Sequence, residues 1–407
     1  MRAIASRMPF RSWLRTPLWV FAALVLATVT ACTTSVAGTP VRQQTDPASL
    51  EVGNYQTTPR VVGNAKTDKQ SRIRESQRLS DYVALPFESD RDYTYECSNG
   101  VRSHLVTNHK GLGDILINDT FDDVAHDLRG GWVNTWCSGS DDDEKHRKLS
   151  IAVLELPDAG RAAEVGPTLE QDDFTYNIDN RPVALPKYPD SKAHWRPNVA
   201  SLGSWTVHDR YVVFIKIVDE LAAAPDLPDM TGRTERMLDV ALPLLEKFTP
   251  TPADKFEHMP LDPDGILGRT LPSNPQLPMR PDPDGAYTGR GAIQSLDGTD
   301  LDFLTIGDID QVGYGDALVF HSRTGKAAAA LWDKWDPVRN PEDGHQAIAP
   351  PPGFPGDVGC FAIVKNGYTM FHQCTFHVDR YNVQVGASNV VVLYQMTSAE
   401  YVLVTSR

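Results

Sequence analysis

The chain has 407 residues, of which 41% are hydrophobic and 9% aromatic, as in an ordinary globular protein. Its length suggests two or three domains. The net charge of −14 at pH 7 argues against a nucleic-acid partner and against electrostatic docking on anionic lipid headgroups.

The first 31 residues have the pattern of a secretory signal peptide. Four arginines and no acidic residue accompany a short apolar run over residues 18–30, which small residues follow. The apolar run has about 13 residues, too few to cross a bilayer, which needs roughly 20. We therefore predict that residues 1–31 are a cleaved signal peptide and that the mature chain does not span the membrane.

Cys32 directly follows Val29-Thr30-Ala31, which are the residue types that the lipoprotein signal peptidase needs. A cysteine at the first mature position is typical of a bacterial lipoprotein, in which the thiol carries a diacylglycerol. One acyl chain binds a membrane only marginally, whereas two or three hold a protein there. We predict that Cys32 carries acyl chains such as palmitate and attaches the protein to the extracytoplasmic face of the cell membrane. The alternative is a plain cleaved signal in which Cys32 is incidental.

Residues 32–60 are rich in Thr, Ser, Pro and Gln and lack apolar periodicity, which predicts a disordered tether. Residues 61–249 are expected to form an N-terminal α+β domain. Its apolar patterns predict helices over 66–84 (ended by Pro86), 119–128, from Pro157 to 171 (capped by Asp158) and 231–248, extended chain over 93–106, strands over 132–137 and 149–156, and a hairpin of 202–207 with 211–218.

Nine prolines lie between residues 249 and 285, and they cannot supply the amides that a helix or sheet needs. We therefore place a proline-rich linker at 250–285 and a C-terminal α+β domain at 286–407. In this domain the sequence predicts strands over 317–321, 359–365, 368–377 and 380–387 and a helix over 324–335. The tail, 389–406, is ambiguous between helix and strand.

Two short matches indicate an internal duplication. Gly160-Arg161-Ala162-Ala163 resembles Gly325-Lys326-Ala327-Ala328, and Asp209-Arg210-Tyr211 recurs as Asp379-Arg380-Tyr381. Each member of the first pair follows a strand at a helix start, and each member of the second lies at a hairpin turn. If the halves are duplicates, their strands and helices must occur in the same order.

Besides Cys32, the chain has four cysteines: Cys97, Cys137, Cys360 and Cys374. An exported chain is in an oxidising compartment, so disulfides are expected, and four cysteines allow three pairings. We favour Cys97–Cys137 and Cys360–Cys374, because each pair lies inside one half of the chain. A two-residue turn at Asn366-Gly367 would place Cys360 opposite Gln373, so pairing with Cys374 requires one extra residue or a bulge.

Catalytic and cofactor motifs are absent from the sequence, and we predict no catalytic, cofactor-binding or metal-binding residue. Gly111-Leu112-Gly113 and Gly313-Tyr314-Gly315 lack the third glycine of a dinucleotide-binding loop, and Gly325-Lys326 lacks the hydroxyl of a phosphate loop. Asp262-Pro263-Asp264-Gly265 and Asp282-Pro283-Asp284-Gly285 fail as calcium loops and favour turns instead.

Three further clusters have a functional and a structural interpretation. His372, Cys374 and His377 resemble a metal cluster, but 377 points away from the other two on a strand, and a disulfide would consume Cys374. Trp332 and Trp335 could stack on a sugar, although core packing is favoured. Asp209-Arg210-Tyr211 could clamp a ligand, although a turn followed by a strand is favoured.

The segment Arg78-Leu79-Ser80-Asp81-Tyr82-Val83-Ala84-Leu85-Pro86-Phe87-Glu88, together with the Cys32 signal and the tether, resembles uncharacterised actinobacterial lipoproteins of the mycobacterial and nocardial kind. These proteins are built from a domain of unknown function, and the helix start at Gly160 fits the same pattern. The resemblance covers most of the mature chain. It implies a cell-envelope lipoprotein with no assigned activity, and it carries over no functional residues.

The sequence therefore predicts two small α+β domains, each a mainly antiparallel sheet with helices packed on one face. The expected role is that of a non-catalytic binding or accessory lipoprotein that engages a small molecule, a lipid or an envelope protein. Such a protein should have an apolar cleft between its domains. The alternatives are an envelope hydrolase, with a nucleophile and a base in one pocket, and a wall-associated structural protein with an exposed apolar patch.

Overall fold

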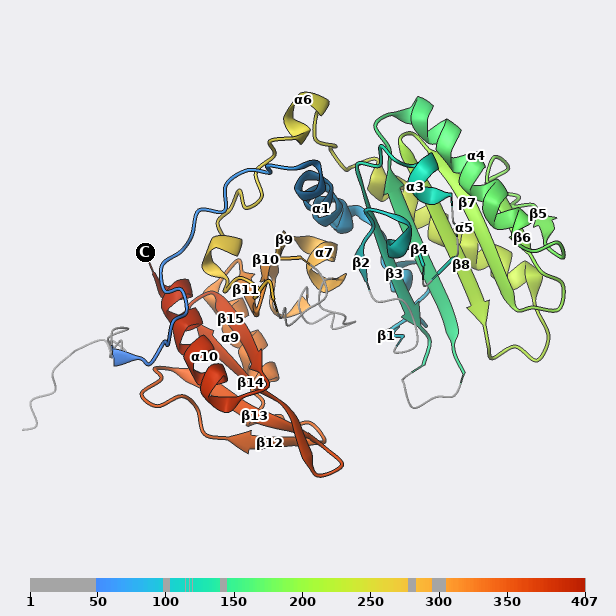
Figure 1. The fold of residues 1–407 in the computed structure, drawn as a ribbon. Helices are drawn as coiled ribbons and strands as arrows, with labels where there is room; N and C mark the ends of the chain where they lie inside the picture. The colour runs from blue at the N-terminus through green and yellow to red at the C-terminus, as the bar shows by residue number, and fades with distance from the viewer. Residues whose placement is uncertain are drawn as a thin grey trace, which may run out of the picture. The chain divides into compact units, whose positions relative to one another are not determined.

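A computed structural model describes residues 49–97, 103–139 apart from 114, 117 and 119, 145–276, 283–294 and 305–406. The predicted signal peptide and Cys32 lie outside the described residues. The N-terminal half is built on an antiparallel sheet in the order β1-β3-β4-β8-β7-β6-β5, with β2 also paired to β3 (Figure 1). Its strands are β1 (Tyr95–Glu96), β2 (His104–Leu105), β3 (Gly130–Cys137), β4 (Arg147–Glu155), β5 (Arg181–Val183), β6 (Lys192–Trp195), β7 (Ser201–His208) and β8 (Tyr211–Asp219).

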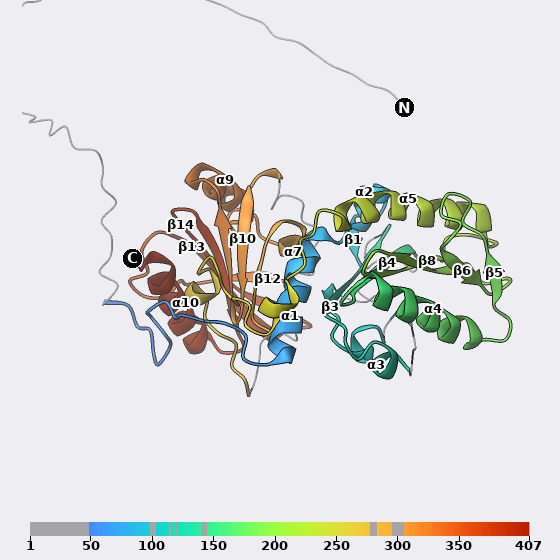
Figure 2. The same ribbon diagram turned by 90° about the horizontal axis from the view of Figure 1, so that it is seen from above.

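Helices cover both faces of this sheet. Figure 2 shows α4 (Ala159–Thr175) and α5 (Leu227–Leu245) on opposite sides of the strands. The other helices of this half are α1 (Asp68–Leu79), α2 (Pro86–Ser89) and α3 (Phe121–Val124), with short 3-10 turns at η2 (Ser80–Tyr82) and η3 (His109–Gly111). The expectation of helices on one face is wrong because β4 and β8 are apolar on both sides, so each face needs a cover.

Pro86 begins a helix rather than only ending one. The helix expected over 66–84 is confirmed as α1 followed by η2, after which Pro86 occupies the first turn of α2, where its missing amide costs nothing. Asp158 accepts a hydrogen bond from the Arg161 amide at 2.9 Å and so caps α4, as predicted.

The C-terminal half has a second antiparallel sheet, in the order β12-β13-β14-β15-β11-β10-β9. Its elements are β9 (Gly285–Tyr287), α7 (Gly289–Gln294), β10 (Ile309–Tyr314), β11 (Ala317–Ser322), α9 (Gly325–Trp335), β12 (His345–Ile348), β13 (Asp357–Lys365), β14 (Tyr368–Val378), β15 (Tyr381–Ala387) and α10 (Val390–Thr405). The tail that the sequence left ambiguous is therefore a helix, capped by the Asn389 side chain. The α+β class with two antiparallel sheets is confirmed.

The two halves repeat one topology. Reading β3-β4-α4-β5-β6-β7-β8-α5 against β10-β11-α9-β12-β13-β14-β15-α10 gives the same succession of elements and the same order in the sheet. Local details agree as well. The Leu156 amide donates to the Arg210 carbonyl at 2.9 Å, and the Ser322 amide donates to the Arg380 carbonyl at 2.8 Å.

The hairpin turns of the two halves also match. Asp209 and Asp379 both have positive φ, at 49° and 51°. The helix caps, Asp158 and Thr324, align one residue away from the match that the sequence suggests between Gly160 and Gly325. These agreements are what a duplication predicts.

The end of the predicted tether is packed against the rest of the chain. Leu50 is buried, the Arg60 amide donates to the Gly268 carbonyl at 3.0 Å, and the Ser406 hydroxyl donates to the Thr57 carbonyl. The tether predicted over 32–60 is therefore wrong for residues 49–60, because apolar side chains in this polar segment find a partner in the C-terminal half. Residues 32–48 lie outside the described residues.

The proline-rich segment contains two short helices, α6 (Ala253–Phe256) and η4 (Leu267–Arg269), and buries Phe256, Ile266 and Leu271. The segment is therefore packed against the rest of the protein between the two halves that it connects.

Disulfides join Cys97 to Cys137 and Cys360 to Cys374, with Cα atoms 5.3 and 4.1 Å apart. Cys360 lies opposite Cys374 in the β13–β14 hairpin, and the register shifts between Ile363 and Val364. The shift leaves Met370 as the extra residue of a bulge. The irregularity that the cysteine spacing predicts is thereby confirmed.

Candidate functional site

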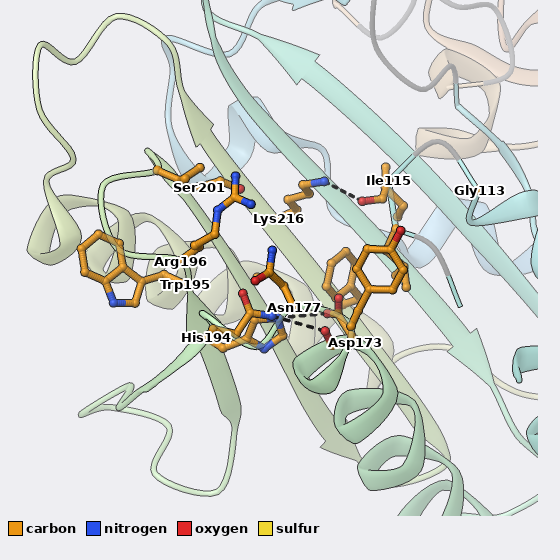
Figure 3. A pocket seen from close by; sticks show the side chains of 15 residues that line it. Gly113, Ile115, Asp173, Asn177, His194, Trp195, Arg196, Ser201 and Lys216 are labelled. Carbon is orange, nitrogen blue, oxygen red and sulfur yellow. Dashed lines mark hydrogen bonds and ion pairs between the residues drawn. The ribbon is translucent and has the colours of Figure 1, made fainter. Parts of the chain in front are cut away.

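A pocket of about 430 Å³ opens on the α4 side of the N-terminal sheet, beside the end of that helix (Figure 3). The volume is within the range of small-molecule sites. Four parts of the chain line it: Gly113 with Ile115 and Leu116, the end of α4 with the following loop, β6 with the loop after it, and the facing parts of β7 and β8. The lining residues are Gly113, Ile115, Leu116, Asp173, Tyr176, Asn177, Asn180, His194, Trp195, Arg196, Val199, Ser201, Gly203, Phe214 and Lys216.

Strand alternation places Phe214 and Lys216 on the pocket side of β8, while Ile215 and Ile217 face the core under α5. Lys216 is half-buried, and its ammonium donates to the Ile115 carbonyl at 2.7 Å. Burial lowers the pKa of Lys216, and the charge of Asp173 offsets this only in part. An ammonium has three N–H donors, and this carbonyl is the acceptor for Lys216 among the described residues, so two donors are left to a ligand there.

Asp173 is held at the wall of the pocket by two partners. The Trp205 indole donates to its Oδ2 at 2.8 Å, and His194 Nε2 lies 3.4 Å from the same oxygen. The His194 ring also packs edge-on against Phe174, with 5.6 Å between the ring centroids. This carboxylate is therefore occupied by neighbours that fix its position.

The rim combines a cation, aromatic rings and amides. Figure 3 shows Arg196 reaching toward the pocket from the loop after β6. Tyr176, which is 66% exposed, and Trp195 offer aromatic surface. Asn180 is fixed by a hydrogen bond to the Phe174 carbonyl at 2.9 Å, whereas the Asn177 amide nitrogen has no hydrogen bond to any described residue.

A hydrolytic site would need a nucleophile within hydrogen-bond reach of a base. The pocket has an Asp173–His194 pair, but within the described part of the chain the Ser201 hydroxyl forms no hydrogen bond and His194 Nδ1 is buried without a partner. The arrangement can bind a molecule through charge and aromatic contact. It does not assemble a nucleophilic relay.

The equivalent position in the C-terminal half is closed. The Gln373–Gly386 pair of β14 and β15 occupies the place of Gly203–Lys216 in β7 and β8. A Cβ added at Gly386 would lie 2.4 Å from the Phe371 ring, so this ring covers the site where the lysine stands in the other half. One copy of the duplicated fold keeps the pocket and its cation, and the other fills it with an aromatic side chain.

A second pocket, of about 400 Å³, lies where α1 meets the proline-rich segment and is lined by Arg74, Arg78, Thr251, Asp254, Lys255, His258, Met259, Pro260 and Pro263. Arg78 is bound by Glu75 at 2.6 Å and stacks over Phe248, and Arg74 donates to the Ala286 carbonyl. Since these arginines are engaged in joining segments, we assign the pocket a packing role.

The motifs singled out from the sequence lie outside both pockets, except for Gly113 in the first pocket and Arg78 and Pro263 in the second. Trp332 is buried and stacks on His377, and Trp335 packs against Phe320, so both tryptophans have core roles. Cys374 is in a disulfide. Among the described residues no group of three His, Cys, Asp or Glu could hold a metal ion.

The two aspartate-rich motifs act as turns where they are described. Asp262 accepts hydrogen bonds from the Leu267 and Gly268 amides, and Gly265 has a φ of +78° that suits glycine. Asp282 lies outside the described residues, and Asp284 accepts from the Ser273 amide. Asp209-Arg210-Tyr211 forms the β7–β8 turn and the start of β8.

Sequence reasoning missed the pocket because its walls come from four separate segments. It also expected an apolar cleft between domains, whereas this pocket lies inside the N-terminal half and carries charged groups. One signal was present in the sequence. Lys216 interrupts the apolar run of Tyr211–Asp219, where a buried strand has no reason to place a cation.

No helix within the described part of the chain is long and apolar enough to span a membrane. A comparison with curated proteins found no match. Among solved structures, the chain is similar to the extracellular domain of PknH from Mycobacterium tuberculosis, with 8% identity and a TM-score of 0.27, over 42% of this chain and 97% of that chain.

Two family models match the chain. Residues 62–261 match the N-terminal part of a domain of unknown function, DUF7373, and residues 266–407 match its C-terminal part. The junction between the models falls within the proline-rich segment. Because the two matches together span most of the sequence, the chain belongs to the DUF7373 family.

Proposed function

We propose that this protein is a lipid-anchored binding protein of the cell envelope, which holds a small molecule in the pocket beside α4 and does not transform it. The Cys32 signal supports the anchor, and the two disulfides support an oxidising, extracytoplasmic location. The resemblance of the sequence to actinobacterial lipoproteins supports the same location. Nucleic acid is not among the proposed partners, because the chain is strongly acidic.

The observation that carries the binding role is the contrast between the two halves. Side chains close-pack protein interiors, and the Phe371 ring achieves this in the C-terminal half. In the N-terminal half the same surface stays open and presents Lys216, although burying a cation without a carboxylate partner is unfavourable. A ligand that fills the space and meets the cation accounts for both features.

The anchor is tested by replacing Cys32 with serine or by inhibiting the lipoprotein signal peptidase with globomycin. We expect the wild-type chain in the membrane fraction, with the intact mass of an acylated protein. The Cys32→Ser chain should lack this mass increment and either leave the membrane or stay unprocessed. Unchanged fractionation and unchanged mass after both treatments would contradict the anchor.

The binding role is tested by native mass spectrometry of the chain purified from its own envelope in nonionic detergent. We expect a bound molecule on the wild type. The double variant Ser201→Phe/Lys216→Gly, which copies the Phe371 and Gly386 arrangement, should lose it, whereas Lys192→Gln, on the same sheet outside the pocket, should keep it. A molecule retained by the double variant, or no bound molecule on any variant, would contradict binding in this pocket.

A further inference from the structure

The charges that line the pocket do not balance. Lys216 and Arg196 are the lysine and arginine of the lining, and Asp173 is its carboxylate. Asp173 is engaged by Trp205 and His194, while the hydrogen bond of Lys216 goes to a neutral carbonyl. Within the described residues neither Lys216 nor Arg196 forms an ion pair. Among the described residues, the pocket therefore holds two cations without a carboxylate in direct contact, and Asp173 acts on Lys216 only at a distance.

Elsewhere in the chain, buried and half-buried cations are satisfied either by backbone carbonyls, as with Arg74 and Arg269, or by carboxylates. Arg161, Arg233 and Arg147 are each bound by an aspartate, at 2.9, 2.5 and 3.1 Å. The chain as a whole carries a charge of −14, so carboxylates to pair with Lys216 are not scarce. A cation left without a carboxylate inside a concave site is available to an anion that comes from outside.

The other residues of the lining indicate what kind of molecule carries the anionic group. Phe214 forms the floor next to Lys216, with Trp205 packed against it at 4.7 Å between ring centroids. Leu116 and Ile115 close one side, and Tyr176 lies at the mouth. Aromatic and aliphatic walls around one charged end favour a molecule with a flat or apolar body and a single anionic group.

A comparison of the two halves shows that the Lys216 charge and the pocket occur together. In the C-terminal half, Gly386 replaces Lys216 and Phe371 replaces Ser201, so the cation is lost together with the pocket. If Lys216 served only to keep this face of the sheet polar, its loss would have no connection with the filling of the cavity.

We infer that the ligand of this pocket carries one carboxylate or phosphate group, bound between Lys216 and Arg196, on an apolar or aromatic body that packs against Phe214 and Tyr176. This inference rests on the proposed binding role. The planar guanidinium of Arg196 can bind two oxygens of either group, and the two free N–H donors of Lys216 suit the same oxygens.

The test is isothermal titration calorimetry of the full chain in nonionic detergent, with empty micelles as the blank. Benzoate and phenyl phosphate are the anionic probes, and benzamide has nearly the shape of benzoate without its charge. We expect at least one anion to bind, with benzamide weaker by about tenfold or more. The ratio of the two anion affinities distinguishes a carboxylate from a phosphate ligand.

Variants assign the binding to the two cations. Lys216→Met should weaken the tighter anion by about tenfold or more, and Arg196→Gln should weaken it by about three- to tenfold. Lys192→Met, which removes a nearby lysine outside the pocket, should change nothing. Equal affinities for benzoate and benzamide, an unchanged Lys216→Met variant, or no binding of either anion at about 20 mM would each overturn the inference.

The failure of this inference is distinguishable from failure of the proposed function. A neutral molecule found on the protein by native mass spectrometry, and lost in the Ser201→Phe/Lys216→Gly variant, would leave the binding role in place and overturn the anionic ligand. No bound molecule on any variant would overturn both.

Discussion

Lys216 distinguishes the side of β8 that lines the pocket from the side that packs under α5. Its neighbours Ile215 and Ile217 are buried under α5, and Phe214 is buried on its own side. Replacing Lys216 with an apolar residue would cost nothing in core packing and would remove a partly desolvated charge. Its presence in this strand is best explained by a partner that the protein does not itself provide.

The affinity for an anion should therefore depend on the protonation of Lys216. Burial lowers its pKa below the ordinary lysine value, so its ammonium loses the proton at a lower pH than a surface lysine. We expect the affinity for the tighter probe to be constant near neutral pH and to fall, as the pH rises, before the ordinary lysine value of 10.5 is reached. Calorimetry across this range checks it, and in Lys216→Met the fall should be absent.

Glu155 is a second residue whose charge is not matched by its surroundings. It is 1% exposed, and its Oε2 is buried without a hydrogen-bond partner. Burial, with a further contribution from the charge of Glu75, raises the pKa of Glu155 to about 8. Because the folded pKa exceeds the unfolded one, the stability that Glu155 provides is complete below about pH 4 and is lost as the pH rises through 8.

We therefore expect Glu155→Gln to raise the melting temperature at pH 8.5 and to have little effect at pH 4.5. The amide keeps the shape and the donor of the protonated acid without an ionisation to penalise. Thermal unfolding at the two pH values measures the difference. The control is Glu164→Gln, since Glu164 is exposed. An equal shift at both pH values would contradict the assigned cause.

At the scale of elements, the β13–β14 hairpin is the best case of prediction from sequence. The Asn366-Gly367 turn and the distance between Cys360 and Cys374 require one residue too many for a regular ladder, and Met370 is that residue. The turn and the disulfide require strand registers that differ by one residue, and a bulge of one residue between them satisfies both. Covalent spacing therefore predicted a structural irregularity that apolar periodicity alone could not.

Deleting Met370 should remove the bulge and keep the disulfide. Its side chain is 61% exposed, and after deletion the ladder runs from Val364–Thr369 directly to Ile363–Phe371, which keeps Cys360 opposite Cys374. We expect the disulfide to form in full and the melting temperature to change by a few degrees at most. Deleting Thr375 instead should move Phe376 out of the core and unfold the hairpin. Peptide mapping without reductant and thermal unfolding check both variants.

Other elements show where sequence reasoning stops. The hairpin of β7 and β8 and the capped helix α4 were predictable, because their periodicity and caps are local. The short strands β6 and β12, at 192–195 and 345–348, were missed because each is held by pairing in the sheet rather than by its own pattern: β6 lies between β5 and β7, and β12 pairs with β13. The pocket was missed for the same reason, since its walls meet only in the folded chain.

At the scale of the whole molecule, the two family domains share one core. All described residues belong to a compact unit, Thr45–Arg407, and one hydrophobic cluster contains Trp132 and Met237 from the first domain together with Ile293 and Phe320 from the second. Domains joined by an apolar core of this kind are expected to unfold together. The proline-rich segment therefore connects the two sheets without making them independent.

Gln294 lies at the centre of this junction. From α7 its Oε1 accepts hydrogen bonds from Trp132 Nε1 and Asn134 Nδ2, both at 2.6 Å, and its Nε2 donates to the Ser80 carbonyl at 2.8 Å. The side chain is 1% exposed. One amide therefore satisfies buried polar groups on β3 and on η2, and no water can replace it without opening the interface.

We expect Gln294→Ala to destabilise the whole chain rather than one half. Leaving the Trp132 indole N–H and one of the two Asn134 N–H groups buried without an acceptor costs about 2–4 kcal/mol, since the other Asn134 N–H keeps the Ala84 carbonyl. Differential scanning calorimetry should show one transition in the wild type and one transition at lower temperature in the variant. Gln276→Ala, at an exposed position, is the control and should match the wild type. If Gln294→Ala instead split the transition into two, or moved only part of it, the two domains would be separate folding units held together by this amide.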